Sequence, residues 1–170
     1  VAFYSEFVAP SFQGLPTDLG LAPKWQALAK LAHHSTGFQA ISGHECQFLN
    51  DTDAMIAAMI DDIDRAERAV VLMFYIIDPK GEVEKLLLAL EQASLRGVRC
   101  EILADGVGSA QFFSTAWCAR LKKSGVLIHQ SLAIGLLKAV LVRSDLRNHR
   151  KLLVVDERVA YTGSYNLVDP

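Results

Sequence analysis

The sequence lacks the features of membrane-spanning, secreted or nucleic-acid-coating proteins. No stretch reaches the roughly 18 to 20 uninterrupted apolar residues that cross a bilayer, and the N-terminus has neither the basic region nor the apolar core of a signal peptide. The formal net charge is −2, with 17 basic and 19 acidic residues, so the chain has no basic footprint for nucleic acid. We expect a soluble or peripheral protein in which any recognition of anions is local.

Cysteine is also scarce. The three cysteines are odd in number and far apart, which fits neither a disulfide framework nor paired metal ligands: Cys46, Cys100 and Cys118. They are predicted to be small buried hydrophobes in a reducing compartment. The histidines of the first 44 residues have no carboxylate or cysteine partner at ligand spacing, so we expect no metal and no cofactor.

The chain does have enough apolar residues for a core, since 51% of its 170 residues are hydrophobic and 21% are charged. Residues 1–43 mix aromatics, prolines and glycines around one helical candidate, Pro23–His33, and are interpreted as a lead-in segment. Residues 44–170 are predicted to form one domain.

Apolar runs and amphipathic stretches alternate within residues 44–170. The periodicities predict helices at Thr52–Glu67, Val83–Leu95 and Ala110–Lys123, and strands at Val70–Ile77, Val98–Ala104, Val126–His129, Leu152–Val155 and Val159–Tyr161. This order predicts an α/β fold with a mostly parallel or mixed sheet flanked by helices, whose central strands are buried on both faces. The apolar stretch Leu132–Val142 is too short to span a membrane and fits a core element better than a helix at a bilayer interface.

Polar residues of the C-terminal segment are arranged around its two predicted strands. Residues two apart in an extended chain point to the same side, so His149 and Lys151 share one face, and Ser164 and Asn166 share a face of a second element. Two adjacent antiparallel strands joined by a turn at Asp156 would bring both polar pairs to one ligand.

Such a pocket suits displacement at a phosphodiester. A neutral imidazole attacks phosphorus, and the Lys151 and Asn166 donors hold the non-bridging oxygens while charge develops. A carboxylate such as Asp156 can orient a histidine and fix its tautomer, although the spacing does not show which histidine it reaches.

The spacing His-x-Lys, then Asp five residues after Lys, then Gly-Ser-x-Asn resembles the signature of the phospholipase D superfamily. The surrounding segments, from about Gly37 to Pro170, resemble the N-terminal catalytic half of bacterial cardiolipin synthases. These segments include Asp62–Ala66, Phe74–Ile76, Gly97-Val98, Asp105–Ser109, Asp145–Lys151, Ala160–Ser164 and Val168–Pro170.

The resemblance implies a layered phospholipase-D-like fold and roles for the motif residues. His149 would be the nucleophile, Asp156 the supporting carboxylate, and Lys151, Ser164 and Asn166 the phosphate-binding groups. The implied reaction moves a phosphatidyl group from one phosphatidylglycerol to another through a phosphohistidine, giving cardiolipin and glycerol without a metal. Arg143, Arg147 and Arg150 flank the histidine, and Arg147 and Arg150 are predicted to attract the anionic substrate.

Proteins of that family unite two such motifs in one active site, and only one occurs in this sequence. The chain starts at Val1 and stops four residues after Asn166, so we expect a piece of a longer, C-terminally extended protein whose parent lies at the bacterial cytoplasmic membrane. The expected partners are phosphatidylglycerol and other anionic phospholipids, a membrane surface, and a second phospholipase D half, either the missing region or a homodimer mate.

Two alternatives remain open from the sequence. A hydrolase or nuclease of the same superfamily would form a symmetric homodimer in which two copies of His149 share one site, but the chain lacks the basic footprint of a nucleic-acid partner. A half-domain without its general acid would instead bind anionic lipid or a partner half and turn nothing over.

Overall fold

The structure of the protein is a computed structural model, which describes residues 20–131 and 149–169. The chain divides into two compact units, residues 1–48 and 49–170. In the first unit, helix α2 (Pro23–Thr36) begins with a proline and ends at Gly37, whose left-handed backbone (φ +78°) directs its N–H to the carbonyl of His33. This confirms the helix predicted around Pro23–His33, and none of its side chains is buried.

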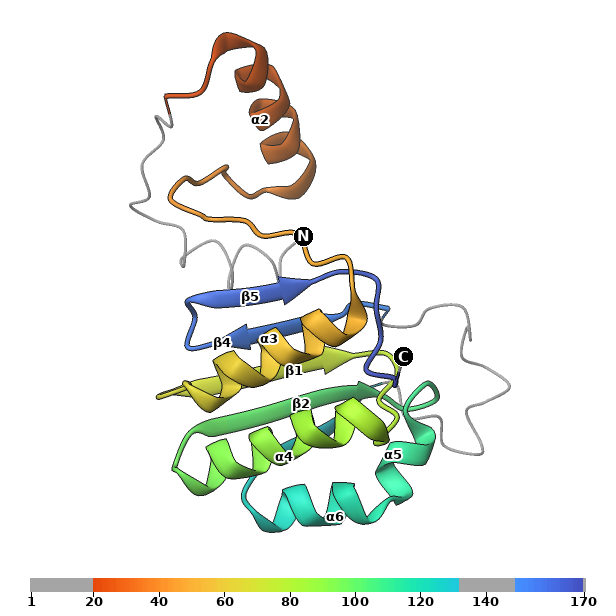
Figure 1. Cartoon of the computed structure of the whole chain (residues 1–170). Coiled ribbons are helices and arrows are strands. Elements are labelled where there is room, and N and C mark those ends of the chain that lie inside the picture. The colour runs from red at the N-terminus through yellow and green to blue at the C-terminus, as the bar shows by residue number, and fades with distance from the viewer. Residues whose placement is uncertain (1–19, 132–148, 170) are drawn as a thin grey trace, which may run out of the picture. The chain divides into compact units, whose positions relative to one another are not determined.

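The second unit is built on a five-stranded mixed sheet (Figure 1), as the sequence predicted. Its strands are β1 (Ala69–Phe74), β2 (Arg99–Asp105), β3 (Leu127–Ser131), β4 (Leu152–Val155) and β5 (Val159–Thr162), in the order β3-β2-β1-β4-β5. β1, β2 and β3 are parallel, β4 runs antiparallel to β1, and β5 runs antiparallel to β4. The C-terminal hairpin therefore lies beside the first strand.

In the described part of this unit, four helices accompany the sheet: α3 (Thr52–Asp64), α4 (Gly81–Leu95), α5 (Ala110–Ser114) and α6 (Ala116–Lys123). The single helix expected over Ala110–Lys123 is divided at Thr115, so that prediction was wrong in its middle. Thr115 has an extended backbone, and its hydroxyl accepts a hydrogen bond from the N–H of Cys118. The threonine thus caps a new helix, as hydroxyl side chains commonly do.

The core lies between the sheet and its helices, and α3 and α4 lie on the same face of the sheet (Figure 1). Burial alternates along β1: Val70, Leu72 and Phe74 are buried, whereas Val71 and Met73 are partly exposed. The expectation that β1 is buried on both faces was therefore wrong for the described residues. Its apolar run reflects one buried face and one half-buried face.

The cysteine expectation holds at two positions of three. Cys100 and Cys118 are buried in the core, whereas Cys46 is exposed. The stretch Leu132–Val142 lies outside the described residues. Among the described residues, no helix is long and apolar enough to cross a membrane.

The start of helix α4 is held by a residue distant in sequence. Lys80, at the N-cap, has no side-chain capping bond, and the carboxylate of Asp169 instead accepts a hydrogen bond of 2.8 Å from the N–H of Glu82. A side chain at Gly81 would meet that carboxylate at 1.9 Å, and φ there is +51°. Glycine is therefore required at the point where the two segments meet.

Candidate active site

Three of the motif residues, His149, Lys151 and Asn166, gather at the carboxyl end of β1, at residues 75–77. The chain leaving β5 returns to this point, where the N–H of Leu167 donates to the carbonyl of Ile76 and the N–H of Asp78 donates to the carbonyl of Leu167. Leu167 also forms an isolated parallel bridge with Ile77. Because β4 is antiparallel to β1, its first residues reach the same end of the sheet.

His149 is exposed and lies against the ring of Tyr75. The two ring centroids are 4.3 Å apart, and the rings are tilted by 46°. This contact places the imidazole beside the end of β1, where it is exposed and therefore accessible to a ligand.

Lys151 lies beside the same tyrosine. Its ammonium nitrogen is 2.8 Å from the carbonyl oxygen of His149, to which it donates, and 5.8 Å from the centroid of the Tyr75 ring. An ammonium group has three N–H donors, so two are left for a ligand. The expectation that His149 and Lys151 share one face agrees with this placement around Tyr75.

Asn166 is fixed from the other side of residues 75–77. Its Oδ1 accepts a hydrogen bond of 3.3 Å from the N–H of Ile76, so the group that it can offer to a ligand is the amide nitrogen. Ser164 is exposed in the bend between β5 and Asn166. The structure thus places Asn166 next to the residue that contacts His149.

Asp156 lies elsewhere, and this corrects the role expected from the sequence. Its Oδ1 accepts hydrogen bonds of 2.8 Å from the N–H groups of Arg68 and Ala69, and its Oδ2 accepts one of 2.9 Å from the N–H of Glu67. Ala69 and Tyr75 are at opposite ends of β1, about 20 Å apart at 3.3 Å per residue. Asp156 therefore does not orient His149.

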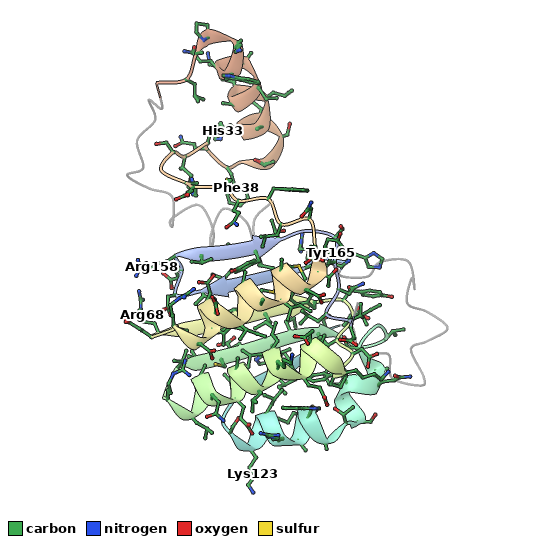
Figure 2. All side chains as sticks on the ribbon, in the orientation of Figure 1. His33, Phe38, Arg68, Lys123, Arg158 and Tyr165 are labelled. Atoms are coloured by element: carbon green, nitrogen blue, oxygen red, sulfur yellow. The ribbon has the colours of Figure 1, made fainter. Side chains whose placement is uncertain are left out.

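Figure 2 shows the same separation, with Arg68 and Arg158 at one end of the sheet and Tyr165 at the other. Asp156 and Lys151 flank the four residues of β4, so the antiparallel register carries them to opposite ends of β1.

Asp156 instead stabilises the turn between β4 and β5. Asp156 and Glu157 both have positive φ (52° and 59°), and the N–H of Arg158 donates to the carbonyl of Val155, as in a type I′ hairpin turn. Hydrogen bonds from the backbone N–H groups of Ala69 and Glu67 hold the pKa of Asp156 below its usual range. The ionised carboxylate therefore anchors a strained turn to the start of β1.

The structure describes one of the two arginines predicted to bind substrate. Arg150 is exposed next to His149, and Arg147 lies outside the described residues. No group of three or more His, Cys, Asp or Glu side chains in residues 20–131 and 149–169 is placed to hold a metal ion.

The sequence assigned no role to Tyr75, and it predicted the turn at 105–109 only as a family turn near the mouth of the active site. Ser109 is buried, its hydroxyl donates to the carbonyl of Tyr75 at 3.0 Å, and it accepts from the N–H of Ile77 at 3.0 Å. The available signal was positional, because Tyr75 and Asp105 both stand at carboxyl ends of parallel strands, where α/β proteins place their sites.

Comparison with known proteins gives the class to which this fold and site belong. Residues 59–169 match the family described as "Cardiolipin synthase, PLD-like domain". The chain belongs to this phospholipase-D-like family.

Two curated relatives, both cardiolipin synthases, agree with this assignment. The chain is 39% identical over 145 residues to a cardiolipin synthase A of Erwinia tasmaniensis and 37% identical over 144 residues to one of Escherichia fergusonii. Each match covers 85% of this chain and 30% of the relative, so the chain spans about a third of these proteins. A solved phospholipase D family member, Nuc from Salmonella typhimurium, is 23% identical with a TM-score of 0.49, covering 66% of this chain and 64% of Nuc.

Proposed function

We propose that this chain is one half of a phosphatidyltransferase that makes cardiolipin through a phosphohistidine on His149. The observation that carries the proposal is the meeting of His149, Lys151 and Asn166 around residues 75–77, in a chain of the cardiolipin-synthase family. An exposed imidazole beside two groups of hydrogen-bond donors is suited to attack on a phosphodiester.

The chemistry follows from these groups. A nitrogen of His149 attacks the phosphorus of one phosphatidylglycerol, forming a P–N bond while the P–O bond to glycerol breaks. The leaving glycerol oxygen takes a proton from an acid that the second half supplies. A hydroxyl of another phosphatidylglycerol then attacks the phosphorus, and the P–N bond breaks. The proton of that hydroxyl passes to the conjugate base of the acid that protonated glycerol.

The neighbours of His149 have separate roles in this scheme. Lys151 offers its remaining N–H donors to the non-bridging oxygens, and Asn166 offers its amide nitrogen. Ser164 and Arg150 are exposed close by in sequence and complete the proposed phosphate-binding set, with Arg147. Membrane contact of the whole protein and pairing with a second half belong to the same proposal.

The first experiment isolates the step assigned to His149. Bis(4-nitrophenyl) phosphate has a leaving group that departs without a proton, so a half-site lacking its general acid should still form the adduct. We expect wild type to release nitrophenolate and to gain an acid-labile adduct on the peptide containing residue 149. His149→Gln should form none, whereas His129→Gln, which alters an exposed histidine of β3, should behave as wild type.

The second experiment tests the substrate. Wild type and His149→Gln are incubated with phosphatidylglycerol vesicles while cardiolipin, phosphatidic acid and glycerol are followed. Cardiolipin from wild type alone supports phosphatidyl transfer. An equal adduct in both proteins would exclude His149 as the nucleophile, and cleavage of DNA without any lipid product would favour the nuclease instead.

A further inference from the structure

Among the described parts of the chain, Tyr75 is the one aromatic side chain that contacts both the proposed nucleophile, His149, and the phosphate-binding Lys151. Its ring lies 4.3 Å from the His149 ring, and the Lys151 ammonium is 5.8 Å from its centroid. Lys151 in turn donates to the backbone of His149. The side chains of His149 and Lys151 therefore both lie against Tyr75. Tyr75 follows β1, whereas His149 and Lys151 precede β4.

The turn at Gly108 and Ser109 contacts Tyr75 and hydrogen-bonds to the backbone on either side of Ile76. Ser109 is 1% exposed, donates to the carbonyl of Tyr75 and accepts from the N–H of Ile77, so it fixes the backbone on both sides of Ile76. A Cβ at Gly108 would lie 2.4 Å from the Tyr75 carbonyl oxygen and 3.0 Å from two carbons of its ring. Only a glycine lets the turn approach this closely.

A phenol ring placed in this way restricts both neighbours. The ring face attracts the ammonium of Lys151, and its contact with the imidazole limits rotation of His149. An exposed histidine would otherwise sample several rotamers, of which few aim a nitrogen at phosphorus. Attack requires a narrow range of geometries, so limiting these rotamers raises the rate.

From these contacts we infer that Tyr75, backed by Gly108 and Ser109, is a positioning residue that aims His149 and Lys151 at the phosphodiester. The inference rests on the proposed function for its effect on rate, but the ring contact itself can be measured without activity. It assigns a task to a residue outside the His-x-Lys and Gly-Ser-x-Asn motifs.

The structural test uses the ring current of Tyr75. The imidazole proton resonances of His149 are identified by their loss in His149→Gln and are then compared among wild type, Tyr75→Phe and Tyr75→Leu. Wild type and Tyr75→Phe should both show upfield-shifted resonances, and Tyr75→Leu should return them to the positions of an exposed histidine. Trp117→Leu removes an aromatic ring of α6 that contacts Arg120 and Glu84, and should change nothing at His149.

The kinetic test uses adduct formation from bis(4-nitrophenyl) phosphate. Tyr75→Leu should slow the maximal rate by about tenfold to a hundredfold with a smaller change in the half-saturating concentration, because orientation rather than binding is lost. Tyr75→Phe should restore the rate to within about threefold, since the ring and not the hydroxyl makes the contacts.

Gly108→Ala provides a second variant that displaces the ring without removing it. It should reduce both the ring-current shift and the rate, in the same direction as Tyr75→Leu. Unchanged His149 resonances in Tyr75→Leu, or a full rate in that variant, would overturn the inference. If the resonances shift as expected but His149→Gln still forms the adduct, the contact stands and the proposed function fails.

Discussion

The hydroxyl of Tyr161 donates a hydrogen bond to the carboxylate of Asp62, which joins strand β5 to helix α3 across 99 residues of sequence. Arg65 forms an ion pair of 3.2 Å with the other oxygen of the same carboxylate. Burial, together with this bond to Asp62, raises the pKa of Tyr161 well above its usual range. The last strand of the sheet is thus tied to the first helix of its unit.

Tyr161→Phe removes this bond while keeping the ring that packs against the core. We expect the free energy of unfolding to fall by about 1–2 kcal/mol, the usual contribution of a hydrogen bond to a charged group that is partly exposed. Urea unfolding followed by circular dichroism measures it. Tyr165→Phe, at an exposed tyrosine, should change stability by less than about 0.5 kcal/mol, and an equal loss in both variants would contradict the role of the Asp62 bond.

Asp156→Asn tests the anchoring of the β4–β5 turn. An amide keeps one acceptor oxygen and brings an NH₂ group toward backbone donors, so we expect the free energy of unfolding at pH 7 to fall by about 1–3 kcal/mol. Because the folded-state pKa of Asp156 is lowered, its contribution is complete above its unfolded pKa of about 3.9 and is lost as the pH falls through the folded value.

The difference between wild type and Asp156→Asn should therefore shrink when urea unfolding is repeated at decreasing pH below about 4. A difference that stays constant over this range would show that the charge of Asp156 is not what the three backbone N–H groups stabilise.

Asn166→Asp tests the acceptor oxygen and the donor nitrogen of this side chain separately. A carboxylate oxygen can still accept from the N–H of Ile76, so the fold should be kept. The variant loses the amide donors and places a negative charge beside the phosphate, and we expect adduct formation on His149 to fall by about a hundredfold or more. Asn50→Asp adds the same charge at an exposed position before α3 and should leave the rate within about twofold. A full rate in Asn166→Asp would remove Asn166 from the phosphate-binding set.

The cysteines should differ sharply in their reaction with iodoacetamide. Burial raises the pKa of Cys100 to about 11, so at pH 8 about one molecule in a thousand carries a thiolate there. Native protein should therefore take up one label, at the exposed Cys46, and unfolded protein should take up three. Mass spectrometry counts the labels, and rapid native labelling of Cys100 would contradict its burial.

Local patterns were sufficient for most elements and for part of the site. The β-branched and aromatic run at Val70–Ile77 predicted β1, although the strand ends at Phe74, and the leucine spacing of Val83–Leu95 predicted α4. The polar pairs of the C-terminal hairpin predicted the proposed site. The break at Thr115 was missed because one hydroxyl residue does not interrupt a helical sequence pattern. Only the capping hydrogen bond of its side chain shows that a new helix begins there.

Contacts between segments that are far apart in sequence could not be predicted from local sequence patterns. Asp156 bonds to backbone groups 87 to 89 residues earlier, and Tyr75 meets His149 only because β4 lies antiparallel to β1. No local periodicity states which strand becomes the neighbour of which. The spacing of residues in the sequence therefore identified the polar residues of the motif. The pairing of β4 with β1 is what places Asp156 at the opposite end of the sheet.

The antiparallel pairing of β1 with β4 also has a consequence for the order in which the proposed site is assembled during folding. β1 and β2 are joined by one helix and can pair as soon as both have been synthesised, whereas β4 must close a much longer loop to reach β1. Asp169, which lies still further along the chain, accepts a hydrogen bond from the N–H of Glu82 at the start of α4. We expect a growing chain to form its parallel layer before the C-terminal hairpin docks, so that His149 reaches Tyr75 only after the parallel strands have paired.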